Sequence, residues 1–182
     1  VSSGFVPDLD IALNAAAGEV PILPGDPTSV WRFQGQLLKG DRASLVNLER
    51  SYLGPIIRAR TGQKVRIRFT NQMADQTIVH WHGLHVPADM DGHPRLVIPR
   101  GETYVYEFEV RNRAGTYWYH PHPHGSTGPQ VYGGLAGLFL VSDDEEEAAG
   151  LPAGEYDIPL VLQDRTFDRT NQLVYLSGHH ME

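Results

Sequence analysis

Short runs of β-branched and aromatic residues, separated by glycine and proline, recur along the whole chain. Two of these runs alternate between apolar and polar positions. In residues 64–70, Val65, Ile67 and Phe69 are separated by arginines, and residues 103–110 show a similar alternation. A period of two over several residues is typical of a β-strand with one buried face. Further runs of this composition cover residues 30–38, 56–60, 77–84, 115–120, 134–141 and 158–163.

Many short strands with turn residues between them predict an all-β sandwich or barrel. The 19 glycines and 13 prolines are spread along the chain as breaks between the runs and do not form a low-complexity block. Helical periodicity is almost absent, and residues 44–52 are the best short candidate for a helix. The only repeated feature is a His-X-His motif.

An acidic run at residues 143–147 marks the expected end of the first domain. The stretch 148–154 after it contains glycine and proline and is typical of a solvated linker. One more strand is expected within residues 157–167, and a single strand with a tail cannot bury a core of its own. We therefore expect residues 1–147 to form one domain, and residues 148–182 to be a linker and the first strand of an incomplete second domain.

The composition fits an ordinary globular core and excludes several kinds of chemistry. Hydrophobic residues make up 41% of the chain, and 22 acidic against 15 basic residues give a formal net charge of -7. An acidic surface argues against nucleic acid or an anionic membrane as the partner, and no apolar stretch approaches the ~20 residues of a membrane helix. The chain has no cysteine, which excludes disulfides and thiolate metal sites. Because the chain starts at Val1 with no apolar secretory segment before it, we expect a processed or trimmed start.

Seven of the nine histidines are concentrated in the segments VHWHGLHVP, DGHPR and YWYHPHPHG. On a strand, residues i and i+2 point to the same face. His80 and His82 are therefore expected to present two imidazoles together, while Trp81 points to the opposite face.

A second pair, His120 and His122, follows an aromatic run. Pro121 between them has no N–H to donate, which places this pair at the end or edge of a strand. Two imidazoles on one side can hold one metal ion or two neighbouring ions. Imidazole ligands suit copper, zinc, iron or nickel, and they exclude magnesium and calcium. The alternative is a set of structural histidines, but two such pairs among nine histidines favour metal binding.

The remaining histidines are weaker candidates. His85 has the wrong strand parity for the first pair and is expected at the surface or behind the ligands. His93 precedes a proline in a predicted loop. His124 has the parity of the second pair, but a proline separates it from that pair, which favours a supporting role over ligation. His179 and His180 are assigned no role.

The segments HWHGLHVPADMDG and GTYWYHPHPHG, followed by YGGLAGLFLV, resemble the first cupredoxin domain of multicopper oxidases. The likeness is strongest to the bacterial laccase and cuprous oxidase branch, and it covers most of residues 50–165. The segment YLGPIIRARTGQKVRIRFTN fits the strand pair that precedes the first histidine motif in that family. The resemblance implies a cupredoxin-like (plastocyanin-like) Greek-key β-sandwich or barrel.

In that family, four His-X-His motifs supply eight ligands to a trinuclear copper cluster between the first and last cupredoxin domains. The resemblance implies that His80 is a ligand of the type 2 copper. It implies that His82, His120 and His122 are ligands of the type 3 copper pair. Asp91, in the segment DMDG, falls where the family keeps a carboxylate that assists proton delivery to reduced oxygen. Taken alone, an Asp-Gly pair is first a turn signal.

The reaction implied by the resemblance is four one-electron oxidations of a substrate, coupled to reduction of O2 to water. Electrons enter at a type 1 copper with a cysteine ligand, and this chain has no cysteine and only half of the His-X-His motifs. We therefore expect an enzyme only as part of a full-length, laccase-like oxidase with copper as cofactor. The expected partners are the remaining cupredoxin domains, or another copy in an oligomer, and O2. The resemblance also implies a periplasmic or secreted protein.

Two other hypotheses stay open. The first is a non-catalytic copper-binding or assembly module whose site is completed by another chain. The second is a zinc- or iron-dependent enzyme of another β fold with a four-histidine site, such as a cupin. A cupin would need a glutamate soon after the first pair, whereas the carboxylates here are Asp89 and Asp91, with no glutamate before Glu102.

Overall fold

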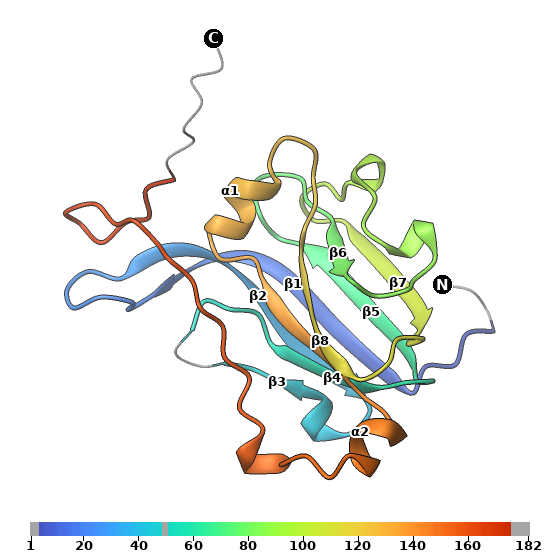
Figure 1. Cartoon of the computed structure of the whole chain (residues 1–182). Helices are drawn as coiled ribbons and strands as arrows, with labels where there is room; N and C mark the ends of the chain where they lie inside the picture. Colours follow the sequence, from blue (N-terminus) through green and yellow to red (C-terminus); the bar gives the residue numbers. More distant parts are fainter. Residues whose placement is uncertain (1–3, 49–50, 176–182) are drawn as a thin grey trace.

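The alternating runs form the strands of two facing β-sheets (Figure 1). The computed structural model describes residues 4–48 and 51–175. Within this part of the chain, one sheet has four strands in the order β2-β1-β5-β7, and the other has five in the order β3-β4-β9-β8-β6. The strands are β1 (Leu9–Val20), β2 (Thr28–Lys39), β3 (Leu45–Val46), β4 (Ile56–Arg60), β5 (Lys64–Asn71), β6 (Val79–His82), β7 (Thr103–Glu109), β8 (Gly115–Pro121) and β9 (Gly137–Ser142).

The chain crosses repeatedly between the two sheets. After the β1-β2 hairpin it enters the second sheet at β3 and β4, returns at β5, crosses again to β6, returns at β7 and ends in β8 and β9. These crossings produce one parallel pair in each sheet, β1 with β5 and β4 with β9. The all-β sandwich predicted from the sequence is confirmed.

One hydrophobic cluster lies between the sheets. On β5, Val65, Ile67 and Phe69 are fully buried, as their alternation predicts. Trp81 of β6 and Tyr119 of β8 are also fully buried in this cluster. Because alternate residues of a strand face opposite sides, burying these two aromatic rings turns the histidines next to them towards the outer face.

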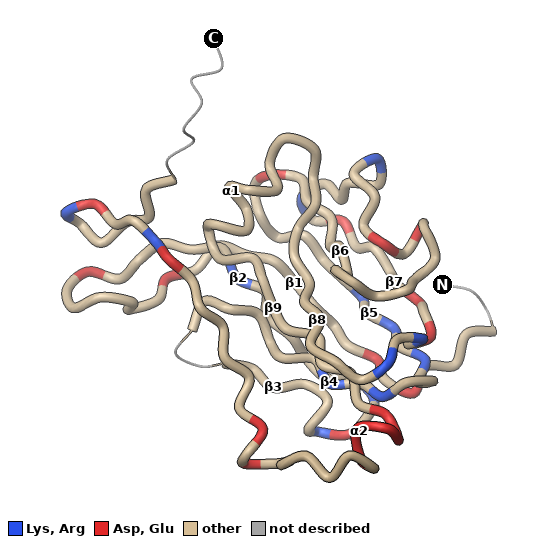
Figure 2. Tube along the Cα trace, viewed as in Figure 1, with Lys and Arg blue, Asp and Glu red and all other residues tan. Residues whose placement is uncertain are grey.

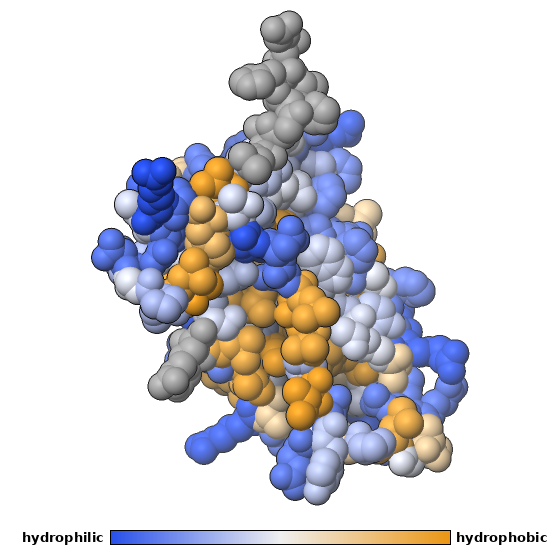
Figure 3. Space-filling model, turned by 60° about the vertical axis from the view of Figure 1, so that its left-hand side comes forward, coloured by the Kyte–Doolittle hydropathy of each residue, from blue (hydrophilic) through white to orange (hydrophobic). Residues whose placement is uncertain are grey.

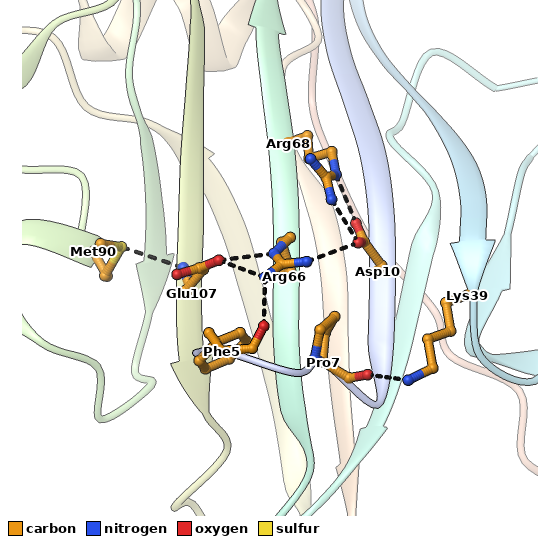
Figure 4. Close-up of polar contacts among 8 residues, drawn as sticks. All are labelled: Phe5, Pro7, Asp10, Lys39, Arg66, Arg68, Met90 and Glu107. Carbon is orange, nitrogen blue, oxygen red and sulfur yellow. Dashed lines mark hydrogen bonds and ion pairs between the residues drawn. The ribbon is translucent and has the colours of Figure 1, made fainter. Parts of the chain in front are cut away.

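The outer face of the first sheet carries a buried ion network beside the N-terminal segment (Figure 4). Arg66 on β5 donates to the Glu107 carboxylate at 2.8 Å and to the carbonyl oxygen of Phe5 at 2.7 Å. Asp10 lies 3.4 Å from Arg66 and accepts from Arg68 at 2.9 Å. Buried charges are tolerated when they are paired and hydrogen-bonded. The network therefore holds the N-terminal segment against this sheet.

Helices are few and short in the described chain. They are α1 (Thr127–Tyr132), α2 (Asp144–Ala148) and four 3-10 turns, η1 (Arg42–Ser44), η2 (Ala88–Met90), η3 (Pro94–Leu96) and η4 (Gly154–Tyr156). The helix predicted within residues 44–52 is wrong, because Leu45 and Val46 pair with β4 as a short strand. None of the described helices has the length and apolar character needed to cross a membrane.

The acidic run at residues 143–147 forms most of the short helix α2. Asp143 caps this helix by accepting the Glu146 N–H at 2.8 Å. Arg60 and Arg113 form ion pairs with its acidic side chains. Figure 2 shows acidic and basic residues gathered around α2. Charge pairing thus ties α2 to β4 and to the turn before β8.

Beyond α2, the chain runs in extended form past β3 towards α1 (Figure 1). The strand predicted within residues 157–167 is not formed among the described residues, where the segment has only an isolated bridge from Phe167 to Leu173. Side chains attach it to the domain, including an Arg58–Asp157 ion pair at 3.1 Å. A strand is stabilised when its backbone groups pair with a neighbouring strand, and among the described residues no ladder joins this segment to β3 or to another strand.

Candidate metal centre

The two His-X-His motifs lie side by side on neighbouring strands. β6 carries His80 and His82 and pairs antiparallel with β8, which places His80 opposite His120. His122 directly follows the end of β8, and its N–H donates to the carbonyl oxygen of Ile78 at 3.0 Å. The structure therefore brings together the four histidines that strand parity selects.

The imidazole rings are close enough to share metal ions. The ring of His80 lies 5.5 Å from that of His82, 5.3 Å from that of His120 and 5.4 Å from that of His122, between centroids. One candidate ligand nitrogen from each of His80, His82 and His120 lies within 4.8 Å of the other two. Two nitrogens bound at ~2 Å to one ion are separated by up to ~4 Å. The three nitrogens are therefore close enough to bind ions of one small cluster, and His122 is near enough to take part in it.

Backbone carbonyls determine which nitrogen is free on two of the rings. His80 Nδ1 lies 2.8 Å from the carbonyl oxygen of Asp91, and His120 Nδ1 lies 2.9 Å from that of Pro121. A carbonyl oxygen only accepts, so each Nδ1 carries the hydrogen and each Nε2 keeps its lone pair for a metal. His82 Nδ1 lies 3.3 Å from His120 Nε2, so these two nitrogens face the same small space.

Burial keeps His120 uncharged. Its side chain is almost fully buried, and this desolvation, helped by the neighbouring histidines, lowers the pKa of His120 to about 4. The hydrogen bond to the Pro121 carbonyl acts in the opposite direction but is the smaller effect. At neutral pH the ring is therefore uncharged and has a free lone pair on one nitrogen, which is the form of histidine that binds metals.

Asp91 lies beside the first histidine pair. Its Oδ1 is 3.1 Å from the same His80 Nδ1 that is hydrogen-bonded to the Asp91 carbonyl. Burial raises the pKa of Asp91, and the nearby His80 partly offsets this. Gly92 allows the close approach, because its φ is +72° and a Cβ there would lie 2.2 Å from the Val79 carbonyl oxygen. Asp91 is thus a partly buried acid in contact with a candidate ligand.

Trp118 forms a wall of the site that the sequence analysis missed. Its ring lies 4.2 Å from that of His120, tilted by 32°, and 5.1 Å from that of His82. The parity rule that selects the histidines also puts Trp118 on this face of β8, two residues before His120. A hollow of about 390 Å³ is lined by His80, His82, Trp118, His120, His122, Thr127, Gly128 and Val131.

The other described histidines lie apart from this group. His85 lines a different hollow. The ring of His93 caps the short turn η3. His124 is exposed in the turn before α1. His179 and His180 lie outside the described residues.

A second, apolar groove of about 580 Å³ adjoins the histidine hollow. The two share Trp118, Gly128 and Val131 as lining residues. The far wall of the groove is formed by the extended segment beyond α2, through Pro159 and Val161. The face that carries the four histidines therefore continues into an apolar surface.

Comparisons with known proteins point to one family. A family model described as multicopper oxidase matches residues 29–146. Multicopper oxidase mco of Staphylococcus aureus is 38% identical over 132 residues, which cover 72% of this chain and 30% of that protein. Cell division protein FtsP of Escherichia coli (strain K12) is 30% identical over 167 residues, covering 85% of this chain and 36% of that protein. The crystal structure of the McoA multicopper oxidase from Aquifex aeolicus matches with a TM-score of 0.78 and 36% identity, covering 94% of this chain and 36% of that one.

The family match includes both His-X-His pairs and Asp91. The relatives are much longer, and this chain spans about a third of their length. The solved relative shares the two-sheet sandwich, in agreement with the expected cupredoxin-like fold. Copper is the metal that the family implies. From its sequence and its fold alike, the chain belongs to the multicopper oxidase family.

Proposed function

We propose that this chain supplies four histidine ligands to half of a trinuclear copper cluster in a longer oxidase. The observation that carries the proposal is the placement of the candidate ligand nitrogens of His80, His82 and His120 within 4.8 Å of one another. Neutral imidazoles with Nδ1 held by a carbonyl suit copper. When bound, copper would supply the one-electron chemistry that couples oxidation of a substrate to reduction of O2 to water.

Within this cluster we assign His80 to the type 2 copper and the other three histidines to the type 3 pair. His80 differs from the rest because the Asp91 loop contacts it from outside the group. His82 and His120 approach each other at 3.3 Å, which supports their sharing one ion. His122 lies on the other side of His80 and would serve the neighbouring ion.

Asp91 is proposed to hold and pass protons at the edge of the site. Its raised pKa and its contact with His80 support this role. In the full-length oxidase, Asp91→Asn keeps the carbonyl that bonds His80 but removes the acid. We expect slower O2 consumption with unchanged copper content. O2 consumption equal to that of the parent across the pH range would show that the carboxyl is not a relay.

We propose that residues 1–147 are the first cupredoxin domain and that residues 148–182 are a linker and the opening strand of a second domain. The extended segment 156–163 supports this division, because it has an outward apolar row as well as an inward one. The outward row is 75–78% exposed and consists of Tyr156, Ile158 and Leu160. Apolar surface also gathers on the side of the molecule shown in Figure 3. The remaining cupredoxin domains, or another copy in an oligomer, would cover it. A periplasmic or secreted location is proposed on the family resemblance alone.

Titration of the purified, metal-free chain with Cu(II) tests the ligand assignment. We expect weak, histidine-type binding without intense blue absorption, because the chain has no cysteine for a type 1 site. His80→Gln and His82→Gln should weaken binding, whereas His85→Gln, outside the group, should not. If the double variant lacking His80 and His82 binds copper as the parent does, the assignment is wrong.

A second candidate is a copper-binding or assembly module without oxidase activity. The similarity to FtsP, which is named for cell division and not for oxidation, favours it. The parent gene distinguishes the two, since an oxidase requires a downstream His-Cys-His segment. Copper-loaded full-length protein should then consume O2 with a reducing substrate. Copper binding without O2 consumption would favour the module. The family assignment removes the cupin-like alternative.

A further inference from the structure

Gln130 is a buried amide that joins the two parts of the chain that carry the histidine pairs. It is the buried residue of α1, with 2% of its surface exposed. Its Oε1 accepts from the hydroxyl of Thr77 at 2.8 Å, and its Nε2 donates to the carbonyl oxygen of Gln76 at 3.0 Å. Both ends of the amide are thus paired, as its burial requires.

The segment that Gln130 grips leads directly into β6. Thr77 is fully buried, and its backbone is held on the other side by two hydrogen bonds to Ile98, of 3.1 and 2.6 Å. The next residue, Ile78, accepts the N–H of His122. Thr77 is therefore a fixed point beside the backbone anchor of His122.

The second histidine pair needs such a connection because the β-ladder stops there. Val79 opposite Pro121 is the last residue pair that joins β6 and β8. His122 is then tied to the other strand by its single backbone bond to Ile78 before the chain turns into α1. Gln130 makes the next link, from α1 back to the entry of β6.

We propose that Gln130 is a positioning residue for the copper site, which clamps α1 to the entry of β6 and so fixes His122 in its place relative to His80. This inference rests on the proposed copper function. An apolar side chain of similar size would fill the space but could not set the register of the two segments. The two directional hydrogen bonds of Gln130, and not its volume, therefore hold α1 in position against the entry of β6.

Gln130→Met and Thr77→Val test the clamp, because each keeps the volume and removes hydrogen bonds. In the metal-free chain, we expect about five- to ten-fold faster amide hydrogen exchange at His122, the effect of losing about one buried hydrogen bond. Cu(II) affinity should fall about ten-fold, as it does when an outer contact of a ligand is lost. Thr77→Ser keeps the hydroxyl and should restore both properties.

Thr28→Val is the matched control. Thr28 is as fully buried as Thr77, and its hydroxyl donates at the same 2.8 Å, but to the carbonyl oxygen of Asn171 away from the histidines. We expect it to lower the melting temperature without changing His122 exchange or copper affinity. An equal change in this control would show a general loss of stability and overturn the proposal.

The proposal is also overturned if folded Gln130→Met matches the parent in both His122 exchange and copper affinity. If that variant does not fold, Thr77→Val decides alone, since it leaves the bond to Gln76 intact. Failure of the parent to bind copper would refute the proposed function. The exchange rate of His122 in the metal-free chain would still decide whether the clamp exists.

Discussion

The Asp91 loop can approach β6 closely because Gly92 in this loop has no side chain. A Cβ at Gly92 would lie 2.2 Å from the carbonyl oxygen of Val79 and 2.7 Å from the nitrogen of His80. Gly92→Ala should therefore push the loop off the strand and weaken the bond from His80 Nδ1 to the Asp91 carbonyl. We expect a loss of stability above the ~1–3 kcal/mol that an unfavourable φ alone costs. We also expect weaker Cu(II) binding. Urea unfolding and copper titration measure the two effects.

Gly62 offers the control for this variant. Its φ is +88°, close to that of Gly92, but nothing lies within 4 Å of a Cβ placed there. Gly62→Ala should lose only the stability that an unfavourable φ costs, and it should leave copper binding unchanged. If the two variants lose the same stability and both bind copper normally, the close approach at Gly92 has no role in the site.

At the residue scale, the sequence could predict which histidines meet, but not what holds them. The period of two along a strand is local, and it selects His80, His82, His120 and His122 without knowledge of the fold. Gln130 acts through a threonine 53 residues away, and no local pattern predicts such a contact.

At the element scale, helix α2 shows how a surface feature joins distant strands. The Asp143 carboxylate accepts the N–H of Ala114 at 2.7 Å and caps the helix through Glu146. These backbone N–H donors, that of Ala114 first, lower the pKa of Asp143 below the ordinary value. Asp143→Ala should lower the melting temperature by roughly 2–4 °C at neutral pH. Asp144→Ala, which removes only a surface ion pair, should change it much less.

The pH dependence of the Asp143 contribution follows from the direction of its shift. A pKa that is lower in the folded state gives stability that is complete above the unfolded value and is lost as the pH falls through the folded value. The difference in melting temperature between the parent and Asp143→Ala should therefore be constant near neutral pH and shrink below the ordinary aspartate range. A difference that persists undiminished in strong acid would show that the carboxylate does not carry the effect.

The elements missed by the sequence analysis have physical reasons. Strand β1 was not predicted, although Leu9, Ile11, Leu13 and Ala15 alternate and are buried. Its second half, AAAGEV, is poor in β-branched and aromatic residues, so its strand state comes from pairing with β2 and β5. The opposite error occurs at residues 157–167, where a good strand sequence has no partner among the described residues. Pairing, which is not local, decides both cases.

At the scale of the whole molecule, charge and apolar surface are separated. Acidic and basic residues gather around α2 and the nearby ends of β1 and β5, whereas β8, β9 and α1 are mostly without charged residues (Figure 2). This region holds the histidine hollow and the adjoining apolar groove, whose lining includes one charged residue, Arg165. Association through this region would bury apolar area with little desolvation of charge, which is favourable.

The outward apolar row of segment 156–163 should make the isolated chain associate with itself. Exposed apolar patches of this kind promote association, so the isolated chain should self-associate as its concentration rises. Ile158→Asp with Leu160→Asp should reduce that association in sedimentation experiments without changing urea unfolding, because both side chains are already exposed. Val161 lines the groove instead, so Val161→Asp should destabilise the attachment of the segment.

In a full-length oxidase the double variant should lower the stability of the protein. The reason is that a further domain would cover the row, and the two new charges would be buried against that domain. A parent chain that stays monomeric at high concentration, together with a full-length double variant of unchanged stability, would show that nothing packs on this row.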